Sequence, residues 1–368
     1  MKWIGYIVIL CSIMMSCQSN PTLTHEKYAY TVFQTGNFDY ACYRSPAIIR
    51  ANNGRLLAFA EARKNNCEDS DVDIMMRSSR DEGKTWNDPV IVWSDSTNTC
   101  GSPTPIIDRQ SGHIHLVSTW RLASDSQRMI EEGTSQNTSR VYVLRSNDDG
   151  DSWSYPRDIT PSVKQADWSW YVTGPGSGHQ ITQGKYANRL IAGCTHTVVG
   201  STISRSHVIY SDDNGSNWQL GGAISTKMTR NCEVAETSTG DLILNMHGEN
   251  NRLVATSTDG GQTWGEPTAD SKVMHLNAQA SLHTHVLEDS RAIIFSNPND
   301  PTEKKNMTVR VSYDDGQTWH QSLQIGKSKC ANSDLVTVND GRLGIIYEGG
   351  VHQPYEQVVY TRLPLDID

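Results

Sequence analysis

The sequence predicts an all-β protein, and more specifically a β-propeller, because one short motif recurs along it. The motif has the form Ser-x-Asp-x-Gly-x-polar-Trp, and each copy follows an apolar or alternating run that is typical of a strand. Strand-and-turn units repeated at intervals of tens of residues are typical of propellers and other repeat architectures. The five copies lie at 79–86, 146–153, 211–218, 257–264 and 312–319.

Each copy is expected to form a hairpin turn with its tryptophan packed on its own blade. The aspartate can accept hydrogen bonds from backbone amides of the turn, the glycine supplies a positive φ, and the tryptophan gives an apolar cap. Successive motif tryptophans are 67, 65, 46 and 55 residues apart, which leaves room for a four-stranded blade in each interval. The repeated residues are therefore interpreted as structural.

Composition narrows the range of partners. The net charge of −9 argues against nucleic acid or an anionic membrane surface as a partner. Of the eight cysteines, six lie beyond residue 17, and none forms a Cys-x-x-Cys or Cys/His cluster. We therefore predict no metal and no organic cofactor. The sequence allows two states for these cysteines, a disulfide between Cys42 and Cys67 or free buried thiols.

The N-terminus predicts export. Lys2 precedes an apolar run at 4–15, and the Ser-Cys pair that follows resembles a bacterial lipoprotein cleavage site with Cys17 as the acylated residue. We therefore assign 1–17 to a signal peptide, 18–35 to a tether and 36–368 to the propeller. The expected location is the bacterial cell envelope, periplasmic or surface-exposed, with membrane contact only through the lipid; plain secretion is the alternative.

From about Tyr40 to the C-terminus, the repeated motif resembles the Asp-box of the sialidase (neuraminidase) superfamily. This resemblance implies a six-bladed, sialidase-like β-propeller with the boxes away from the active site. The segment around Arg44 is similar to the family's Arg-Ile-Pro motif, and Arg63 ends a segment similar to its Glu-Ala-Arg strand. The resemblance implies that Arg44 and Arg63 bind or surround a substrate carboxylate, which a guanidinium can grip with two hydrogen bonds.

The resemblance also places a general acid in the loop after Arg63. Glu68 and Asp69 both fit that position, and Asp71 and Asp73 are assigned to the turn and the next strand. An inverting reaction would need a second carboxylate, for which Glu233 and Glu348 are the candidates.

Further along the chain, the positions that match the family's catalytic residues hold other residue types. The partner glutamate falls on Asn231, the nucleophilic tyrosine on Asn332, the second arginine on His247, and the third on Lys304 or Lys305. Asparagine cannot act as the nucleophile, so the sequence predicts that this is not an ordinary retaining sialidase, unless a nearby tyrosine such as Tyr347 or Tyr355 takes the role. The predicted substrate-binding residues are Arg44, Arg63, His179, His247, Lys305 and Asn332.

Three functions remain open at this stage. The first is an exo-acting glycoside hydrolase on a terminal sugar of a glycan or oligosaccharide, with an acidic or sulfated sugar as the first candidate. The second is a polysaccharide lyase that uses Arg44 with Tyr43, His179 or His247, and the third is a non-catalytic glycan-binding propeller. The sequence leaves open the sugar and linkage, the stereochemical outcome and the oligomeric state.

Overall fold

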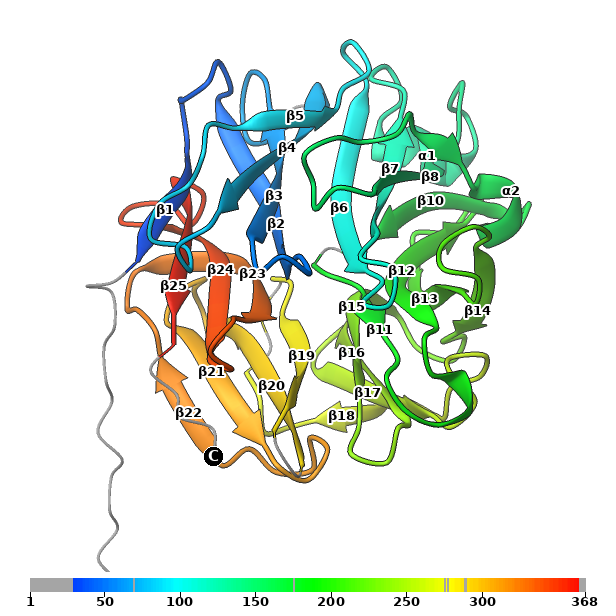
Figure 1. The fold of residues 1–368 in the computed structure, drawn as a ribbon. Helices are drawn as coiled ribbons and strands as arrows, with labels where there is room; N and C mark the ends of the chain where they lie inside the picture. Colours follow the sequence, from blue (N-terminus) through cyan, green and yellow to red (C-terminus); the bar gives the residue numbers. More distant parts are fainter. Residues whose placement is uncertain are drawn as a thin grey trace, which may run out of the picture.

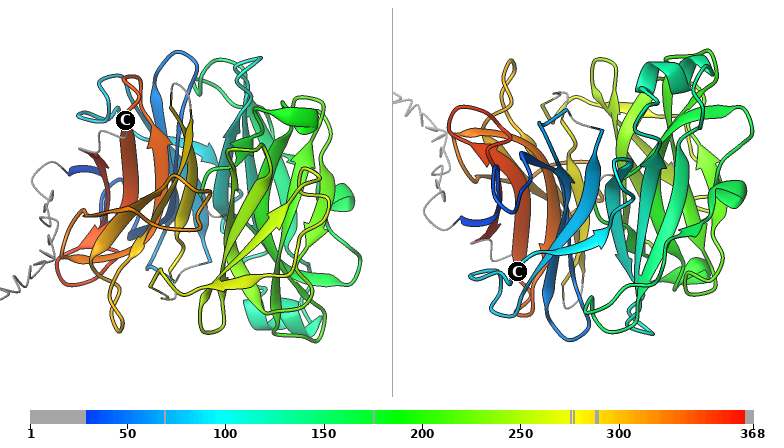
Figure 2. Two further views of the ribbon diagram at one scale, coloured as in Figure 1. Left: turned by 90° about the horizontal axis from the view of Figure 1, so that it is seen from below. Right: turned by 90° about the horizontal axis from the view of Figure 1, so that it is seen from above.

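The computed structural model describes residues 29–68, 70–174, 176–274, 276, 278–287 and 290–363. Antiparallel sheets are arranged around a central axis, with β2, β6, β15, β19 and β23 near the centre and β5, β14, β18 and β22 outside (Figure 1). Seen edge-on, the strands run between the two faces of this ring (Figure 2). The predicted all-β propeller fold is confirmed.

Four of the sheets are separate blades. Their strand orders are β1-β25-β24-β23, β10-β12-β13-β14 with β11 beside β12, β15-β16-β17-β18, and β19-β20-β21-β22. The strands of these sheets are β1 (Tyr30–Gln34), β10 (Trp168–Thr173), β11 (His179–Gln180), β12 (Leu190–Val198), β13 (Ser204–Ser211), β14 (Gln219–Ala223), β15 (Thr229–Glu236), β16 (Leu242–Gly248), β17 (Arg252–Ser257), β18 (Thr268–Asp270), β19 (Ser281–Val286), β20 (Arg291–Pro298), β21 (Met307–Ser312), β22 (Gln321–Gln324), β23 (Lys329–Thr337), β24 (Leu343–Gly350) and β25 (Gln357–Arg362).

The predicted count of six blades is wrong, because the remaining strands form one eight-stranded sheet. Its order is β2-β3-β4-β6-β7-β8-β9, with β5 paired to β4. Val72 of β4 pairs in parallel with Thr99 of β6, and this pairing joins two antiparallel runs that would otherwise be separate. The strands are β2 (Cys42–Arg50), β3 (Leu56–Arg63), β4 (Val72–Ser79), β5 (Val90–Trp93), β6 (Thr99–Ile107), β7 (Ile114–Arg121), β8 (Arg140–Ser146) and β9 (Arg157–Asp158).

The two ends of the described chain meet in one sheet. Tyr30 of β1 pairs with Tyr360 of β25. The segment predicted to be a tether, 18–35, therefore contributes a strand, and the first strand of the described residues pairs with the last one. The short helices α1 (Gln127–Glu132), α2 (Thr160–Val163) and η2 (Gly184–Tyr186) lie in connections between strands. Within the described residues, no helix is long and apolar enough to cross a membrane.

The repeated motifs form hairpin turns, as predicted. In the first copy, Ser79 Oγ accepts from Gly83 N at 2.9 Å, and Asp81 Oδ1 accepts from Thr85 N at 2.9 Å. The other four copies repeat both bonds. These bonds join residues four apart, so the motif can fold locally wherever a strand delivers it.

The motif tryptophans do not simply cap their own blades. Trp86, which follows β4, packs edge-to-face on Tyr360 of β25, with ring centroids 5.7 Å apart. Trp218, which follows β13, lies 6.2 Å from the ring of His115 in β7. Trp319 instead lies near Phe295 of its own sheet, at 5.5 Å. Trp86 and Trp218 thus pack with residues of their own sheets, as predicted, and also fill the space between neighbouring sheets.

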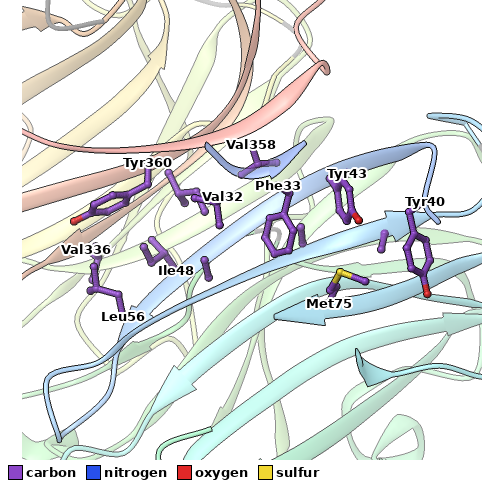
Figure 3. Close-up of a cluster of buried hydrophobic side chains, with 14 of the residues drawn as sticks. Val32, Phe33, Tyr40, Tyr43, Ile48, Leu56, Met75, Val336, Val358 and Tyr360 are labelled. Atoms are coloured by element: carbon purple, nitrogen blue, oxygen red, sulfur yellow. The ribbon is translucent and has the colours of Figure 1, made fainter. Parts of the chain in front are cut away.

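The hydrophobic core is divided among the interfaces between sheets. Figure 3 shows one such cluster, in which Val32, Phe33 and Tyr360 meet Ile48 and Met75. All five side chains are buried, and Phe33 stacks on Tyr43 with ring centroids 5.0 Å apart. Burial of this apolar surface fixes each sheet against the next. The inner strands are thereby held around the axis, which is where the candidate site lies.

Candidate active site

Bulges interrupt four inner strands near their N-terminal ends. The pairing register shifts between Arg44 and Ala47 in β2, and at corresponding places in β6, β15 and β23. Ser45, Ser102 and Asn231 in these bulges have φ of 52°, 55° and 46°. Residues other than glycine rarely adopt positive φ, and such backbone strain gathers at functional sites. The bulges mark one end of the axis as the candidate site.

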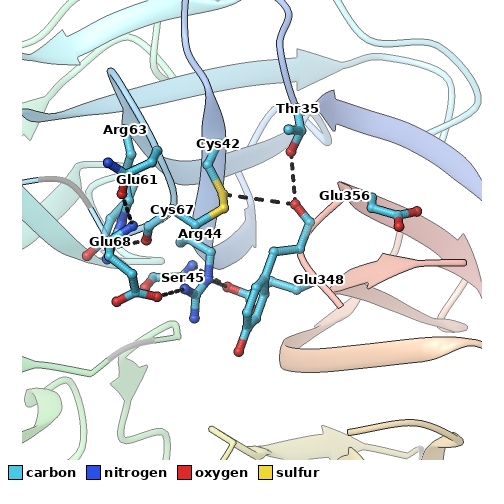
Figure 4. Close-up of a disulfide and its surroundings, with 12 residues drawn as sticks. Thr35, Cys42, Arg44, Ser45, Glu61, Arg63, Cys67, Glu68, Glu348 and Glu356 are labelled. Carbon is cyan, nitrogen blue, oxygen red and sulfur yellow. Dashed lines mark hydrogen bonds and ion pairs between the residues drawn. A yellow bond between two sulfur atoms is a disulfide. The ribbon is translucent and has the colours of Figure 1, made fainter. Parts of the chain in front are cut away.

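Glu348 holds Arg44 in place at this end. Its carboxylate is fully buried and accepts from Arg44 Nε at 2.9 Å, from Ser45 N at 2.8 Å, and from Asn332 N and Nδ2 at 3.1 and 3.3 Å. Figure 4 shows Arg44 between Glu348 and the acidic loop. Although burial opposes it, the Glu348 charge raises the pKa of Arg44. Glu348, predicted as a second catalytic carboxylate, is thus placed as the anchor of Arg44.

Tyr355 lies against the same arginine. The Arg44 guanidinium carbon is 3.7 Å from the centre of the Tyr355 ring, a close cation–π contact. Lys304 Nζ lies 2.9 Å from the Tyr355 hydroxyl. A phenolic oxygen therefore lies beside two cations at the end of the axis that the bulges mark.

A disulfide fixes the acidic loop beside Arg44. Cys42 of β2 is bonded to Cys67, which settles the pairing left open by the sequence. Glu68 follows directly; its side chain is 85% exposed, and Oε1 lies 3.7 Å from Arg44 Nη1. Of the two candidate acids, Glu68 therefore has an accessible carboxyl at the site, whereas Asp69 lies outside the described residues.

Arg63 holds the acidic loop by a hydrogen bond to the loop backbone. Its Nη1 donates to the carbonyl oxygen of Cys67 at 2.5 Å, and its Nη2 donates to Glu61 Oε2 at 2.6 Å. Glu61 also accepts from the amide of Ser102 at 2.8 Å. Burial opposes ionisation of Glu61, but the Arg63 charge and these hydrogen bonds lower its pKa to about 2. The Arg63 guanidinium is therefore occupied by its hydrogen bonds to Glu61 and to the loop backbone.

The remaining matched positions lie at the same end. Arg230 Nε lies 3.4 Å from His247 Nδ1. An arginine side chain therefore contacts His247, the position that matches the family's second arginine. Asn332 Oδ1 accepts from the amide of Gln279 at 2.9 Å, and its Nδ2 donates to Glu348. The Asn332 side chain is thus held on both sides.

A buried acid pair, Glu233 and Asp334, lies deeper along the axis. Glu233 accepts from Gln279 Nε2 at 2.9 Å and from Leu282 N at 2.6 Å. Burial raises the pKa of both carboxyl groups, and for Glu233 the neighbouring Asp334 adds to the increase. Asp334 accepts at 2.8 to 3.3 Å from Ile48 N, Leu335 N, Ser177 N, Ser177 Oγ and Ser281 Oγ. Glu233 is thus placed as an interior group rather than a carboxylate facing substrate.

Two predicted site residues have side chains that are engaged by other partners. His179 belongs to β11, and its Nε2 lies 3.4 Å from Glu236, the last residue of β15, at the far end of the axis. Lys305 pairs with Asp300 at 3.3 Å and with Glu303 at 2.8 Å. Lys304, its neighbour, is the lysine that contacts Tyr355.

Comparison with known proteins agrees with this architecture. A family model described as the BNR repeat-like domain matches residues 54–345. The chain belongs to this family, within the sialidase superfamily. It is 29% identical over 352 residues to a sialidase of Bacteroides fragilis, covering 89% of this chain and 64% of that protein. It is 30% identical over 337 residues to a sialidase of Micromonospora viridifaciens, covering 86% and 51%. The chain thus spans about half to two thirds of the length of these relatives.

Solved structures resemble this BNR repeat-like chain as well. A Hadza microbial sialidase matches with a TM-score of 0.82 and 26% identity, covering 92% of this chain and 68% of that one. An intramolecular trans-sialidase of Ruminococcus gnavus matches with a TM-score of 0.76 over 91% and 97%, at 18% identity, which shows the shared fold alone. The superfamily membership predicted from the Asp-boxes is confirmed.

The sequence of this BNR repeat-like protein pointed to Arg44, Glu68 and Asn332. In the structure Arg44 and Asn332 meet at Glu348, and Glu68 lies beside Arg44. It gave no role to Glu61 or to the bulge residue Ser102, and it named Tyr355 only as an alternative. A glutamate two residues before Arg63 was the available signal for the Glu61–Arg63 pair. No local pattern reveals the positive φ of Ser102.

Proposed function

We propose that this protein is an exo-acting glycoside hydrolase that removes a terminal acidic sugar, carboxylated or sulfated, from a glycan. The observation that carries the proposal is Arg44, held by buried Glu348 and stacked on Tyr355, whose hydroxyl meets Lys304. Two cations beside one phenol fit a sugar that bears an anion close to its reacting carbon. Relatives named sialidases support the hydrolase class.

In this proposal Arg44 binds the anionic group and the acidic loop supplies the proton for the leaving group. Glu68 is the candidate acid with an exposed carboxyl beside Arg44, and Asp69 is the alternative. Tyr355 takes the nucleophilic role that Asn332 cannot perform. The Lys304 ammonium stabilises the negative charge that develops on the phenolic oxygen as its proton passes to solvent.

We also propose that the enzyme is not an ordinary retaining sialidase. Asn332 is tied to Glu348 and Gln279, and Asn231 has no carboxylate with which to accept a phenolic proton. We therefore expect negligible hydrolysis of aryl α-sialosides, measured as release of the aryl group at neutral pH. Cleavage at rates normal for enzymes, with kcat of about 1 s⁻¹ or more, would contradict this expectation.

The substrate class is tested by incubating the purified protein with a panel of aryl glycosides and oligosaccharides that end in neutral, uronic and sulfated sugars. We expect release of an acidic monosaccharide, with the Arg44→Gln variant losing the preference for acidic over neutral ends. A panel without any product would favour the glycan-binding alternative. The Glu68→Gln variant should lose about 10²- to 10⁴-fold in rate, least on activated aryl leaving groups, if Glu68 rather than Asp69 is the acid.

One observation favours a polysaccharide lyase as the second candidate. A lyase needs a cation that neutralises a uronate and a base that removes a proton beside it, and Arg44 with Tyr355 offers both groups in contact. Elimination would give unsaturated uronates that absorb ultraviolet light, whereas hydrolysis products do not. The same panel, read at that absorbance, separates the two reactions.

We further propose that the protein is exported and anchored through lipid on Cys17. Residues 1–28 lie outside the described residues, so this proposal rests on the sequence alone. In a bacterial host, the Cys17→Ala variant is expected to leave the membrane fraction, with Cys11→Ala as the matched control. Equal membrane fractions for both variants would contradict lipidation at Cys17.

A further inference from the structure

The ring has a cavity at the end of the axis opposite Arg44. Its volume is about 330 Å³, and its walls come from the C-terminal ends of inner strands. They include Ile48–Arg50 of β2, then His283, Thr284 and Val286 of β19, and Leu335–Thr337 of β23. Arg44 lies six residues before Arg50 on β2, roughly 20 Å away at the rise of a strand.

A loop separates the two ends. A Cβ added to Gly176, which has φ of 100°, would lie 1.9 Å from Glu233 Oε1, so only glycine fits against the acid pair. Ser177, the next residue, donates to Asp334 and also lines the cavity. The cavity and the Arg44 site therefore lie on opposite sides of this loop and the acid pair.

Two arginines at the cavity lack a carboxylate partner among the described residues. Arg50 Nη1 donates to Asn339 Oδ1 at 3.0 Å, and its Nε is buried without a hydrogen-bond partner in the described part of the chain. Arg109 Nη1 donates to the carbonyl oxygen of Arg50 at 2.7 Å. Two guanidinium groups at one cavity that lack a carboxylate partner in the described part of the chain favour binding of an anion.

The carboxylate that contacts the lining residues His179, Thr182 and Arg291 is already neutralised. Glu236 is buried and accepts from Arg291 Nη1 at 2.9 Å and from Thr182 Oγ1 at 2.7 Å. Although burial opposes it, hydrogen bonds from His179 and Thr182 lower the pKa of Glu236 to about 2. The Glu236–Arg291 pair carries no net charge, so the positive charge of the cavity comes from Arg50 and Arg109.

The rest of the lining suits a polyhydroxylated ligand. His283 Nε2 lies 2.9 Å and His285 Nδ1 lies 3.1 Å from Thr337 Oγ1. Burial and nearby positive groups lower the pKa of His283 to about 3, so its ring is neutral and offers hydrogen bonds rather than charge. Ile48 and Ile107 supply apolar wall. The volume falls at the lower end of the range for small-molecule sites.

We propose that this cavity is a second binding site, for a sugar that carries a carboxylate or sulfate. Arg50 and Arg109 bind the anionic group, and the neutral His283 and Thr337 face the hydroxyls. The site lies on the face opposite Arg44 and takes no part in the proposed reaction.

The test measures binding of glucuronate by calorimetry in an Arg44→Gln background, which removes the main anion-binding group of the other face. We expect saturable binding of glucuronate and no binding of glucose, the corresponding sugar without a carboxylate. Adding Arg109→Gln or Arg50→Gln should weaken binding at least about tenfold, whereas adding Arg128→Gln, an exposed arginine on α1, should not.

Three results would overturn the proposal. One is the absence of glucuronate binding in the Arg44→Gln protein. Another is binding that survives when both Arg50 and Arg109 are replaced. The third is inorganic sulfate binding as tightly as glucuronate, which would leave a simple ion site without sugar recognition. Unfolding curves without ligand confirm that each variant is folded, and glycosidase activity does not enter any of these readouts.

Discussion

Replacing Tyr355 by Phe is expected to lower kcat by about 10²- to 10⁴-fold on the glycoside that the panel identifies, with little change in KM. The substitution removes the hydroxyl that lies 2.9 Å from Lys304 Nζ and keeps the ring on which Arg44 stacks. An interaction made only in the transition state changes kcat, whereas lost carboxylate binding changes KM. Steady-state kinetics on the purified variant make the measurement.

Three variants control this experiment. Tyr155→Phe makes the same chemical change at a tyrosine that is 95% exposed, and it should leave kcat unchanged. Arg44→Lys should raise KM for the acidic substrate, because lysine loses the two-pronged contact. Lys304→Met should lower kcat and leave KM unchanged. If Tyr355→Phe turns over as fast as the wild type, Tyr355 is only a support for Arg44 and the nucleophile is another group.

The sequence was informative where interactions are local. The Asp-box turns use bonds between residues two and four apart, so five copies could be placed without knowing the fold. Arg44 and the acidic loop were found because their order along the chain matches a known family. The pairing of β1 with β25, and of β4 with β6, depends on segments that meet only after the ring closes. The residues of these four strands therefore do not reveal by themselves how many separate sheets the chain forms.

The sequence was less informative about what each carboxylate does. Glu348 and Glu233 were both suitable as catalytic groups by residue type, yet burial and hydrogen bonds make one an anchor for Arg44 and the other part of an interior pair. Lys304 and Lys305 are adjacent, and only the fold decides which of them meets Tyr355. Whether a side chain is buried, and which way it points, depends on how the sheets pack and cannot be read from residue type alone.

Replacing Asp334 by Asn is expected to lower the free energy of unfolding by about 3 kcal/mol or more. Five donors converge on this buried carboxylate. An amide in its place loses acceptor capacity and turns two N–H groups toward donors. Urea unfolding at pH 7 measures the loss, and Glu233→Gln is the matched control, since fewer donors converge on Glu233, among them Gln279 Nε2 and Leu282 N.

The pH dependence of that control identifies which acid holds the proton. Burial and the Asp334 charge raise the pKa of Glu233 in the folded state above its unfolded value of about 4.3. A carboxyl group of this kind contributes stability below its unfolded pKa and loses that contribution as pH rises through its folded pKa. Over the interval above about pH 4.3, the wild type should therefore lose stability as pH rises, whereas Glu233→Gln, which keeps only the Asp334 carboxyl of the pair, should lose less. The free energy of unfolding of the variant relative to wild type should increase over that interval. A difference that stays constant would mean that Glu233 is ionised throughout and that the proton lies on Asp334.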